Sequence, residues 1–256
     1  MIARPSPAAD IASHSRKSGE TCRVLVGVCT YNEASNILPL VDRIRAALPD
    51  ADLLIVDDNS PDGTAALIED SFADDDAIRM IVRNNERGLG GAILRAMEEA
   101  IEGEYEFFLN LDGDLSHDPA QLPSLLEKAA TSPQIDVVIG SRYVSGGQLL
   151  GWPWHRRLMS RLVNQFATLC LRLPVRDCSG SMRCYRVSTL KTADLAGLRS
   201  QGYSLLEELL VQLNRQGAKM AEVPITFTDR ERGSSKLTLQ EAVRSIVQML
   251  RLGFTR

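Results

Sequence analysis

Short apolar runs alternate with stretches of helical periodicity between residues 24 and 140. The runs have the length of buried strands, and we predict strands over residues 24–29, 53–56, 78–82, 107–111 and 137–140. Between them, apolar positions recur every three or four residues, which predicts helices over residues 36–47, 64–71, 89–101 and 119–129. Such alternation is typical of an α/β protein with a mostly parallel sheet flanked by helices.

The pattern changes after residue 142. A Gly146-Gly147 pair predicts a loop, and an amphipathic helix with arginine on one side is expected over residues 158–173. Farther along we expect a turn at 178–181, strands near 184–187 and 222–227, and helices over 204–215 and 239–252. Residues 1–22 are rich in Ala, Ser and Pro and lack an apolar core, which predicts a disordered tail rather than a signal peptide.

Composition narrows the class of protein. The 256 residues are 44% apolar and 24% charged, as in a soluble globular domain, and the net charge of −4 gives no indication of nucleic-acid binding. The five cysteines form no Cys-x-x-Cys pair, so neither a zinc site nor a disulfide framework is expected, and a reducing cytoplasm fits best. No apolar run reaches the ~18 residues that span a bilayer, so membrane contact is expected to be peripheral.

The arginines are unevenly distributed. From residue 142 to residue 176 there are six arginines and no acidic residue, and this stretch includes Trp152-Pro153-Trp154. Tryptophan and arginine beside an apolar helix face suit a membrane interface with anionic headgroups, which we predict over residues 146–176. The alternative is a helix that covers the sheet with its arginines in water.

The most specific chemical signal follows the strand predicted at 107–111. This strand ends in Asp112-Gly113-Asp114, two carboxylates separated by one residue at the end of the sheet where α/β proteins bind ligands. Because neighbouring carboxylates resist joint ionisation, a hard divalent cation shared with substrate phosphates is their natural partner. The alternative is an ordinary polar turn.

Three other predicted strand ends carry polar groups. They are Thr30-Tyr31-Asn32-Glu33, the acidic run from Asp57-Asp58 to Thr64, and Arg87-Gly88-Leu89-Gly90 at a helix start. Such groups suit a nucleotide base, ribose or phosphate. Helix capping and solvated turns remain the alternatives, and the glycine spacing is not that of a dinucleotide fingerprint.

Taken in order, these motifs resemble the family 2 inverting glycosyltransferases of GT-A fold, and among them the polyprenyl-phosphate (dolichyl-phosphate) mannose synthases. Gly-Ser-Arg-Tyr at 140–143, Asp-Cys-Ser-Gly-Ser-Met-Arg at 177–183 and Arg-Glu-Arg-Gly-Ser-Ser-Lys-Leu at 230–237 agree with that resemblance, which covers residues 23–237. It implies a Rossmann-like single catalytic domain over 23–237, followed by an amphipathic helix over 238–256.

The resemblance also implies roles for individual residues. The guanine nucleotide would be held by Thr30, Tyr31, Glu33, Asp57, Asp58, Arg87, Gly88 and Asp112. A Mg²⁺ or Mn²⁺ ion would be bound by Asp112, Asp114 and Ser116, with water as the alternative to Ser116, which stands where many relatives carry Gln. Catalysis is assigned to Asp114, Arg142, Arg230 and Lys236.

The expected activity is therefore metal-dependent transfer of mannose from GDP-mannose to a polyprenyl phosphate, at the cytosolic face of a membrane and with inversion. A lipid phosphate is already ionised and needs orientation by Arg and Lys rather than a general base, which fits the absence of a candidate His base. The alternatives are transfer of glucose or N-acetylglucosamine from a UDP-sugar, and an inactive sugar-nucleotide-binding scaffold. The chain itself leaves open whether a small membrane protein anchors the enzyme.

Overall fold

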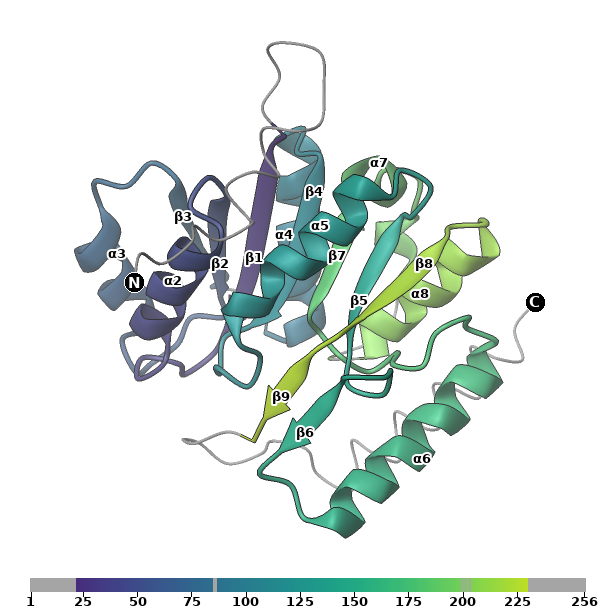
Figure 1. The fold of residues 1–256 in the computed structure, drawn as a ribbon. Coiled ribbons are helices and arrows are strands. Elements are labelled where there is room, and N and C mark those ends of the chain that lie inside the picture. Colours follow the sequence, from purple (N-terminus) through teal and green to yellow (C-terminus); the bar gives the residue numbers. More distant parts are fainter. Residues whose placement is uncertain (1–21, 85–86, 199, 201, 203, 230–256) are drawn as a thin grey trace, which may run out of the picture.

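The computed structural model describes residues 22–84, 87–198, 200, 202 and 204–229. A seven-stranded sheet runs through the molecule in the order β3-β2-β1-β4-β7-β5-β8 (Figure 1). Its strands are β1 (Val24–Thr30), β2 (Asp52–Asp57), β3 (Ile78–Val82), β4 (Phe107–Asp112), β5 (Val137–Ser141), β7 (Arg183–Arg186) and β8 (Met220–Pro224). Only β7 runs against its neighbours β4 and β5, so the predicted mostly parallel α/β sheet is confirmed.

Helices cover both faces of this sheet. One face carries α2 (Ile37–Ala47), α3 (Thr64–Phe72) and α5 (Leu122–Thr131), which follows the short helix η1 (Pro119–Gln121). The other carries α4 (Leu89–Glu102), α7 (Val187–Leu190), α8 (Ser204–Arg215) and the buried side of α6 (Trp154–Leu171). A further short helix, η2 (Leu195–Gly197), leads toward α8.

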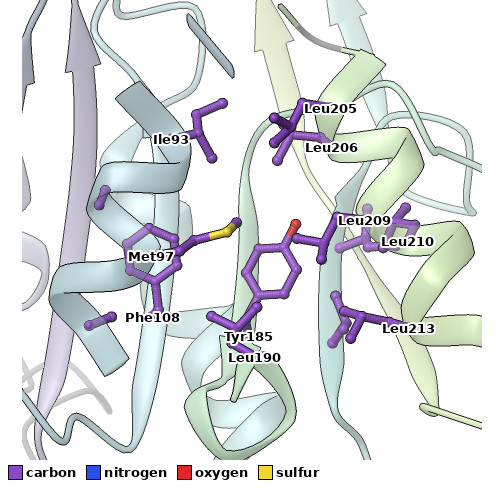
Figure 2. Packing of buried hydrophobic residues seen from close by; sticks show 14 of the residues in the cluster. Ile93, Met97, Phe108, Tyr185, Leu190, Leu205, Leu206, Leu209, Leu210 and Leu213 are labelled. Atoms are coloured by element: carbon purple, nitrogen blue, oxygen red, sulfur yellow. The ribbon is translucent and has the colours of Figure 1, made fainter. Parts of the chain in front are cut away.

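Alternation along the strands divides the core between the two faces. In β1, Val26 and Val28 pack toward α2 and α5, whereas Leu25 and Cys29 pack toward α4. Figure 2 shows the apolar cluster on the α4 side of the sheet, in which Tyr185 of β7 lies between α4 and α8. Because each large apolar side chain contributes about 1.5–3 kcal/mol when buried, these two layers hold the strand ends in fixed register.

Four details differ from the sequence-based expectations. The strand expected over 222–227 is two strands, β8 and β9 (Thr226–Thr228), and Ile225 between them is buried. β9 pairs with β6 (Gln148–Leu150), where a loop was predicted. The antiparallel direction of β7 was not predicted, because apolar periodicity does not encode strand direction. Helix α6 begins at Trp154 rather than at residue 158, directly after Pro153.

Helix α6 lies beyond the β5–β8 edge of the sheet, at the lower right of Figure 1. Its buried residues are Asn164, Ala167, Thr168 and Leu171. Its opposite side exposes large apolar side chains: Trp154, Leu158, Met159, Leu162, Val163, Phe166 and Leu169. Even so, among the described residues no helix combines the length and apolarity that crossing a bilayer requires.

Two predicted segments cannot be compared with the structure. The tail predicted over residues 1–22 lies outside the described residues except for Cys22. The domain end predicted at residue 237 and the helix predicted over 238–256 also lie outside them.

Candidate active site

The carboxyl ends of three neighbouring parallel strands meet at one edge of the sheet. Thr30 at the end of β1 lies opposite Asp57 at the end of β2, and Cys29 lies opposite Asp112 at the end of β4. Burial raises the pKa of the Cys29 thiol, and the nearby charges of Asp112 and Asp58 raise it further. The predicted nucleotide and metal residues are therefore neighbours in space, and the thiol between them is neutral.

The turn after β4 is tightly built. Asp114 is 6% exposed and its Oδ1 accepts a hydrogen bond of 2.9 Å from the backbone N–H of Ser116. Leu115 between them has φ +60°, a left-handed conformation that costs a non-glycine residue about 1–2 kcal/mol. A Cβ on Gly113 would lie 3.0 Å from Cγ2 of Thr30, so glycine lets this turn approach the end of β1.

Buried polar atoms surround the same turn. Ser116 and His117 are each only 2% exposed. Among the described residues, Oγ of Ser116 and both ring nitrogens of His117 nevertheless have no hydrogen-bond partner. Nδ1 of His117 lies 3.9 Å from Oδ2 of Asp112. Burial, and secondly the charge of Arg142, lower the pKa of His117 to about 4, against the opposing charges of Asp114 and Asp177. His117 is therefore neutral near pH 7, and its ring packs on the Phe227 ring, which Arg142 also contacts.

These residues fit a hard divalent cation. The side chains of Asp112, Asp114 and Ser116 offer only oxygen ligands, the type that Mg²⁺ and Mn²⁺ prefer, and the Ser116 oxygen is buried without a partner in the described structure. The described residues contain no group of three His, Cys, Asp or Glu side chains arranged for a metal. Two carboxylates are nevertheless the usual protein contribution where substrate phosphates complete the coordination.

On the β2 side, the two consecutive aspartates differ in their partners. Asp57 is fully buried and accepts hydrogen bonds from Thr30 Oγ1 at 2.8 Å and from the hydroxyl and backbone N–H of Ser60 at 2.6 and 2.7 Å. Asp58 pairs with Arg83 at 2.8 Å and accepts a bond of 2.7 Å from the N–H of Gly88. Asp57 thus holds the turn, while Asp58 fixes the loop that leads into α4.

Tyr31 and Arg87 lie together above this edge. The Arg87 guanidinium carbon is 5.3 Å from the centre of the Tyr31 ring, and Nη1 donates to the Tyr31 hydroxyl at 3.3 Å. Glu33 accepts a bond of 2.7 Å from the side chain of Asn36, and its backbone N–H donates to Thr64 Oγ1 at 3.1 Å. The structure thus brings an aromatic ring, a guanidinium group and carboxylates together, as recognition of a base and ribose requires.

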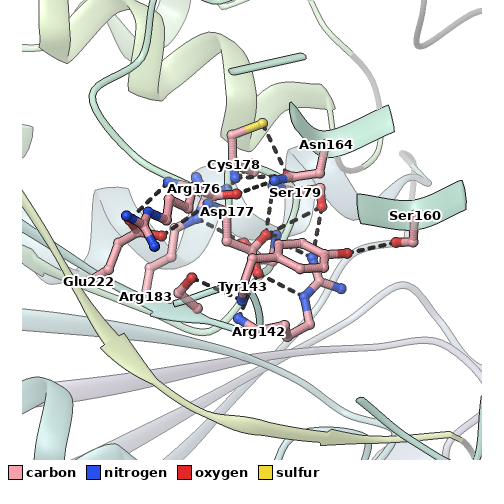
Figure 3. A network of polar contacts seen from close by, with 12 residues as sticks. Arg142, Tyr143, Ser160, Asn164, Arg176, Asp177, Cys178, Ser179, Arg183 and Glu222 are labelled. Carbon is pink, nitrogen blue, oxygen red and sulfur yellow. Dashed lines mark hydrogen bonds and ion pairs between the residues drawn. The ribbon is translucent and has the colours of Figure 1, made fainter. Parts of the chain in front are cut away.

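Arg142 lies on the far side of the carboxylate turn, at the end of β5. Its Nε and Nη2 each donate to Asp177 at 2.8 Å, and Nη2 also donates to Ser179 Oγ at 2.7 Å (Figure 3). Burial alone would raise the pKa of Asp177, but the charge and hydrogen bonds of Arg142 outweigh it and lower the pKa. Burial would likewise lower the pKa of Arg142, yet Asp177 raises it, so both partners are ionised.

Two predicted catalytic residues, Arg230 and Lys236, lie outside the described residues. Sequence reasoning assigned no role to Arg83, although a cation directly after the end of β3 was a usable signal. It also assigned none to Asp177, because the long separation from Arg142 hides their pairing. The roles proposed for the other site residues stay predictions.

Glu207 of α8 is a further buried carboxyl group that sequence reasoning did not single out. It is 4% exposed, and its Oε2 has no hydrogen-bond partner among the described residues. Burial raises its pKa from 4.5 to about 7; Arg183 opposes the shift and Asp177 adds to it. Glu207 therefore titrates near neutral pH.

Comparison with known proteins identifies similar sequences. The sequence profile described as "Glycosyl transferase family 2" matches residues 25–193. The undecaprenyl-phosphate mannosyltransferase of Micrococcus luteus is 37% identical over 231 residues, which cover 90% of this chain and 94% of the relative. The polyprenol monophosphomannose synthase of Mycolicibacterium smegmatis is 37% identical over 232 residues, 89% of this chain and 87% of the relative.

Solved structures share the fold at low sequence identity. Glucosyl-3-phosphoglycerate synthase of Mycobacterium tuberculosis, crystallised with Mn²⁺, UDP and glucosyl-3-phosphoglycerate, aligns with a TM-score of 0.69 and 18% identity over 98% of this chain and 87% of its own. A mannosyltransferase of Pyrobaculum calidifontis in complex with GDP-Man and Mn²⁺ aligns with a TM-score of 0.61 and 16% identity, covering 91% of this chain and 63% of its own.

Proposed function

This chain belongs to glycosyl transferase family 2, and we propose that it transfers mannose from GDP-mannose to a polyprenyl phosphate at a membrane surface. One observation carries the proposal: the Asp112–Asp114 turn and the buried Arg142 guanidinium lie at the same end of the sheet, and His117 is 3.9 Å from Asp112 and packs on the Phe227 ring that Arg142 also contacts. A diphosphate leaving group needs carboxylates that can hold a cation, and a phosphate acceptor needs a guanidinium group in a fixed position. The polyprenyl-phosphate mannosyltransferases that resemble most of the chain support mannose as the sugar and a polyprenyl phosphate as the acceptor, and the GDP-Man complex of the Pyrobaculum calidifontis mannosyltransferase supports the donor.

Asp112 and Asp114, with Ser116 or a water molecule, would hold Mg²⁺ or Mn²⁺, and the Mn²⁺ complexes of structural neighbours support this assignment. When bound, such an ion neutralises the charge that develops on the departing diphosphate. The backbone N–H of Ser116, which donates to Asp114, and the left-handed Leu115 fix this turn, and Gly113 lets it approach the end of β1.

The nucleotide would lie against the ends of β1 and β2. The Tyr31 ring offers a stacking surface for the base, and Glu33 and Asp58 offer carboxylate oxygens to base or ribose hydrogen-bond donors. Asp57 and Thr30 support this surface from below through their mutual hydrogen bond. Arg87 and the backbone of Gly88 would approach the phosphates at the start of α4.

The acceptor phosphate needs no proton removed at neutral pH. Arg142, with Arg230 and Lys236, would orient an acceptor phosphate oxygen for attack on the sugar carbon from the side opposite the diphosphate, which inverts that centre. The buried His117 agrees with this chemistry, because a pKa of about 4 makes it a weak base.

A lipid acceptor also requires contact with a membrane. The exposed apolar side of α6, flanked by Arg157 and Arg161, would rest among anionic headgroups on the cytosolic face. Attachment through a small membrane protein is compatible with the same surface.

A donor screen tests the proposed function. Purified protein with Mn²⁺ would be given radiolabelled GDP-mannose, UDP-glucose or UDP-N-acetylglucosamine and a short polyprenyl phosphate, and label would be extracted into organic solvent. We expect transfer from GDP-mannose that exceeds both UDP-sugars and stops when EDTA is added. Preferential transfer from a UDP-sugar would replace the donor assignment, and no transfer from any donor would favour the inactive scaffold.

A further inference from the structure

The loop over residues 176–181 is fixed by side chains from separate parts of the chain. Glu222 of β8 accepts hydrogen bonds from the backbone N–H groups of Arg176 and Asp177 at 2.8 and 2.9 Å. Arg183 of β7, which is fully buried, donates to the carbonyl oxygens of Gly180 at 2.8 Å and Cys178 at 2.6 Å. The strands thus hold the loop from the side of the sheet.

Helix α6 holds the same loop from the other side. The Asn164 side chain is 3% exposed; its Oδ1 accepts a bond of 3.1 Å from the N–H of Cys178, and its Nδ2 donates to the carbonyl oxygen of Arg176. Asn164 therefore contacts the backbone on both sides of Asp177 (Figure 3). A second link joins α6 to the residue after Arg142, because Ser160 Oγ and the Tyr143 hydroxyl are 2.7 Å apart.

The loop in turn determines the direction of the Arg142 guanidinium. The Asp177 carboxylate accepts hydrogen bonds from Nε, Nη2 and the backbone N–H of Arg142. The Ser179 hydroxyl accepts a further hydrogen bond from Nη2. The remaining nitrogen, Nη1, makes no hydrogen bond to any described residue. The side chain is 8% exposed, and its Cζ lies 5.5 Å from the centre of the Phe227 ring and 5.3 Å from the centre of the Tyr143 ring. Because the guanidinium group is planar and Nε and Nη2 face Asp177, Nη1 lies on the side away from that carboxylate.

We propose that Asn164 is a positioning residue, which fixes loop 176–181 on helix α6 and, through Asp177, holds Arg142 with Nη1 directed at a phosphate oxygen. The inference rests on the proposed role of Arg142 in phosphate handling. It assigns to α6 a task beyond surface contact, because the helix that would meet the lipid also supports the guanidinium that would meet its phosphate.

A double-mutant cycle tests the positioning role. We expect Asn164→Ala to lower kcat/KM for mannosyl transfer about tenfold, and Ser179→Ala, which removes a single acceptor from Nη2, to lower it about threefold. In an Arg142→Gln background, Asn164→Ala should change kcat/KM less than twofold, because a residue that acts through Arg142 has nothing left to position. Gln165→Ala, an exposed amide at the next position of α6, is the matched control and should match wild type.

Effects that multiply in the double variant would overturn the inference, since they would mean that Asn164 acts through general stability. Wild-type activity in a folded Asn164→Ala variant would overturn it as well. Thermal unfolding of each variant identifies one that does not fold, and Ser179→Ala then carries the kinetic test.

A spectroscopic measurement separates this inference from the proposed function. In ¹⁵N-labelled protein, the Arg142 Nε–Hε signal is identified by its loss in Arg142→Gln, and its exchange with water should be at least tenfold faster in Asn164→Ala than in Gln165→Ala. Unchanged exchange overturns the positioning role even if transfer is robust. Absence of mannosyl transfer by the wild-type protein overturns the proposed function instead, and the exchange rate still decides whether Asn164 positions Arg142.

Discussion

Ser116 and His117 are consecutive residues that together bury three polar atoms without a hydrogen-bond partner in the described part of the chain. Each such atom costs about 1–3 kcal/mol, and the left-handed Leu115 next to them adds about 1–2 kcal/mol. Costs of this kind tend to persist where a ligand benefits from them. The turn after β4 is therefore the position in this fold where function, rather than stability, best explains the residues present.

Replacing Asp114 by Asn should lower kcat for transfer by about 10²–10³-fold, because an amide loses the negative charge that a divalent cation needs. The backbone bond from Ser116 can be kept by the amide oxygen, so the unfolding temperature should change little. Steady-state kinetics and thermal unfolding measure the two effects, with Asp70→Asn on the exposed side of α3 as the control. A rate near that of wild type would remove Asp114 from the mechanism.

Glu207 predicts a pH dependence of stability. Its folded-state pKa of about 7 exceeds the ordinary 4.5, so the folded protein binds this proton more tightly than the unfolded chain does. The stabilisation is complete below pH 4.5 and is lost as the pH rises to about 7, an effect of about 3 kcal/mol. Glu207→Gln lacks this titration, so its unfolding free energy relative to wild type should increase by about that amount between pH 4 and pH 8.

Urea unfolding at both pH values measures this difference, and Glu98→Gln, an exposed glutamate of α4, should show no such trend. If Glu207→Gln follows wild type at both pH values, then Glu207 is ionised in the folded protein and is paired in a way that the described contacts do not include.

At the scale of elements, sequence periodicity predicted most of the sheet and its helices but missed what depends on distant contacts. The strands that became β1, β2, β4 and β5 were predicted because their apolar runs are buried on both faces, whereas the edge strand β3 is only partly buried and was predicted from its apolar residues. The antiparallel β7 follows no local signal, since its direction depends on where it pairs with β4 and β5. The start of α6 was predicted four residues too late, because its first turn, from Trp154 to Arg157, lacks apolar periodicity. Pro153, directly before the helix, was a usable signal for the true start.

Part of the candidate site could likewise be predicted from local sequence, and part depends on distant contacts. The carboxylates of Asp112 and Asp114 were predictable because they directly follow a buried strand, and the structure brings them beside Thr30 as expected. The pairing of Arg142 with Asp177 was not, because 35 residues separate the two and only the folded sheet brings them together.

Helix α6 has apolar residues on two opposite sides, and this predicts binding to lipid. Leu158, Leu162, Phe166 and Leu169 are 40–80% exposed and recur at helical spacing, so they form one continuous stripe. We expect the protein to float with vesicles that contain anionic lipid, less so at high salt. Leu162→Asp combined with Leu169→Asp should reduce flotation at least fivefold.

The matched control for flotation is Ser71→Asp, which adds one negative charge at an exposed position of α3, away from the apolar stripe of α6. Flotation that the two leucine substitutions leave unchanged would mean that this side of α6 does not contact lipid. Flotation that is insensitive to salt would remove the arginines from the interaction.

At the scale of the whole molecule, the donor would contact residues from several strands at once. The nucleotide residues belong to the ends of β1 and β2, the carboxylates to β4, and Arg142 to β5. A ligand that contacts all of them stabilises the folded protein by mass action, by about 2.7 kcal/mol at one hundred times its dissociation constant. We therefore expect GDP with Mn²⁺ to raise the unfolding temperature by roughly 5–10 °C.

UDP with Mn²⁺ should produce a smaller shift in the same thermal unfolding experiment, and EDTA should remove most of the shift caused by GDP. A larger shift with UDP would contradict the guanine assignment. A shift that survives EDTA would mean that the nucleotide binds without the cation.

We propose that the carboxylates at the end of β4 hold the diphosphate through a divalent cation. This cation can be located in crystals grown with Mn²⁺ and GDP and measured at a wavelength where manganese scatters anomalously. We expect an anomalous peak within about 2.0–2.4 Å of oxygens from both Asp112 and Asp114 and from the diphosphate. GDP bound with no manganese beside these carboxylates would mean that they do not hold the diphosphate in this way.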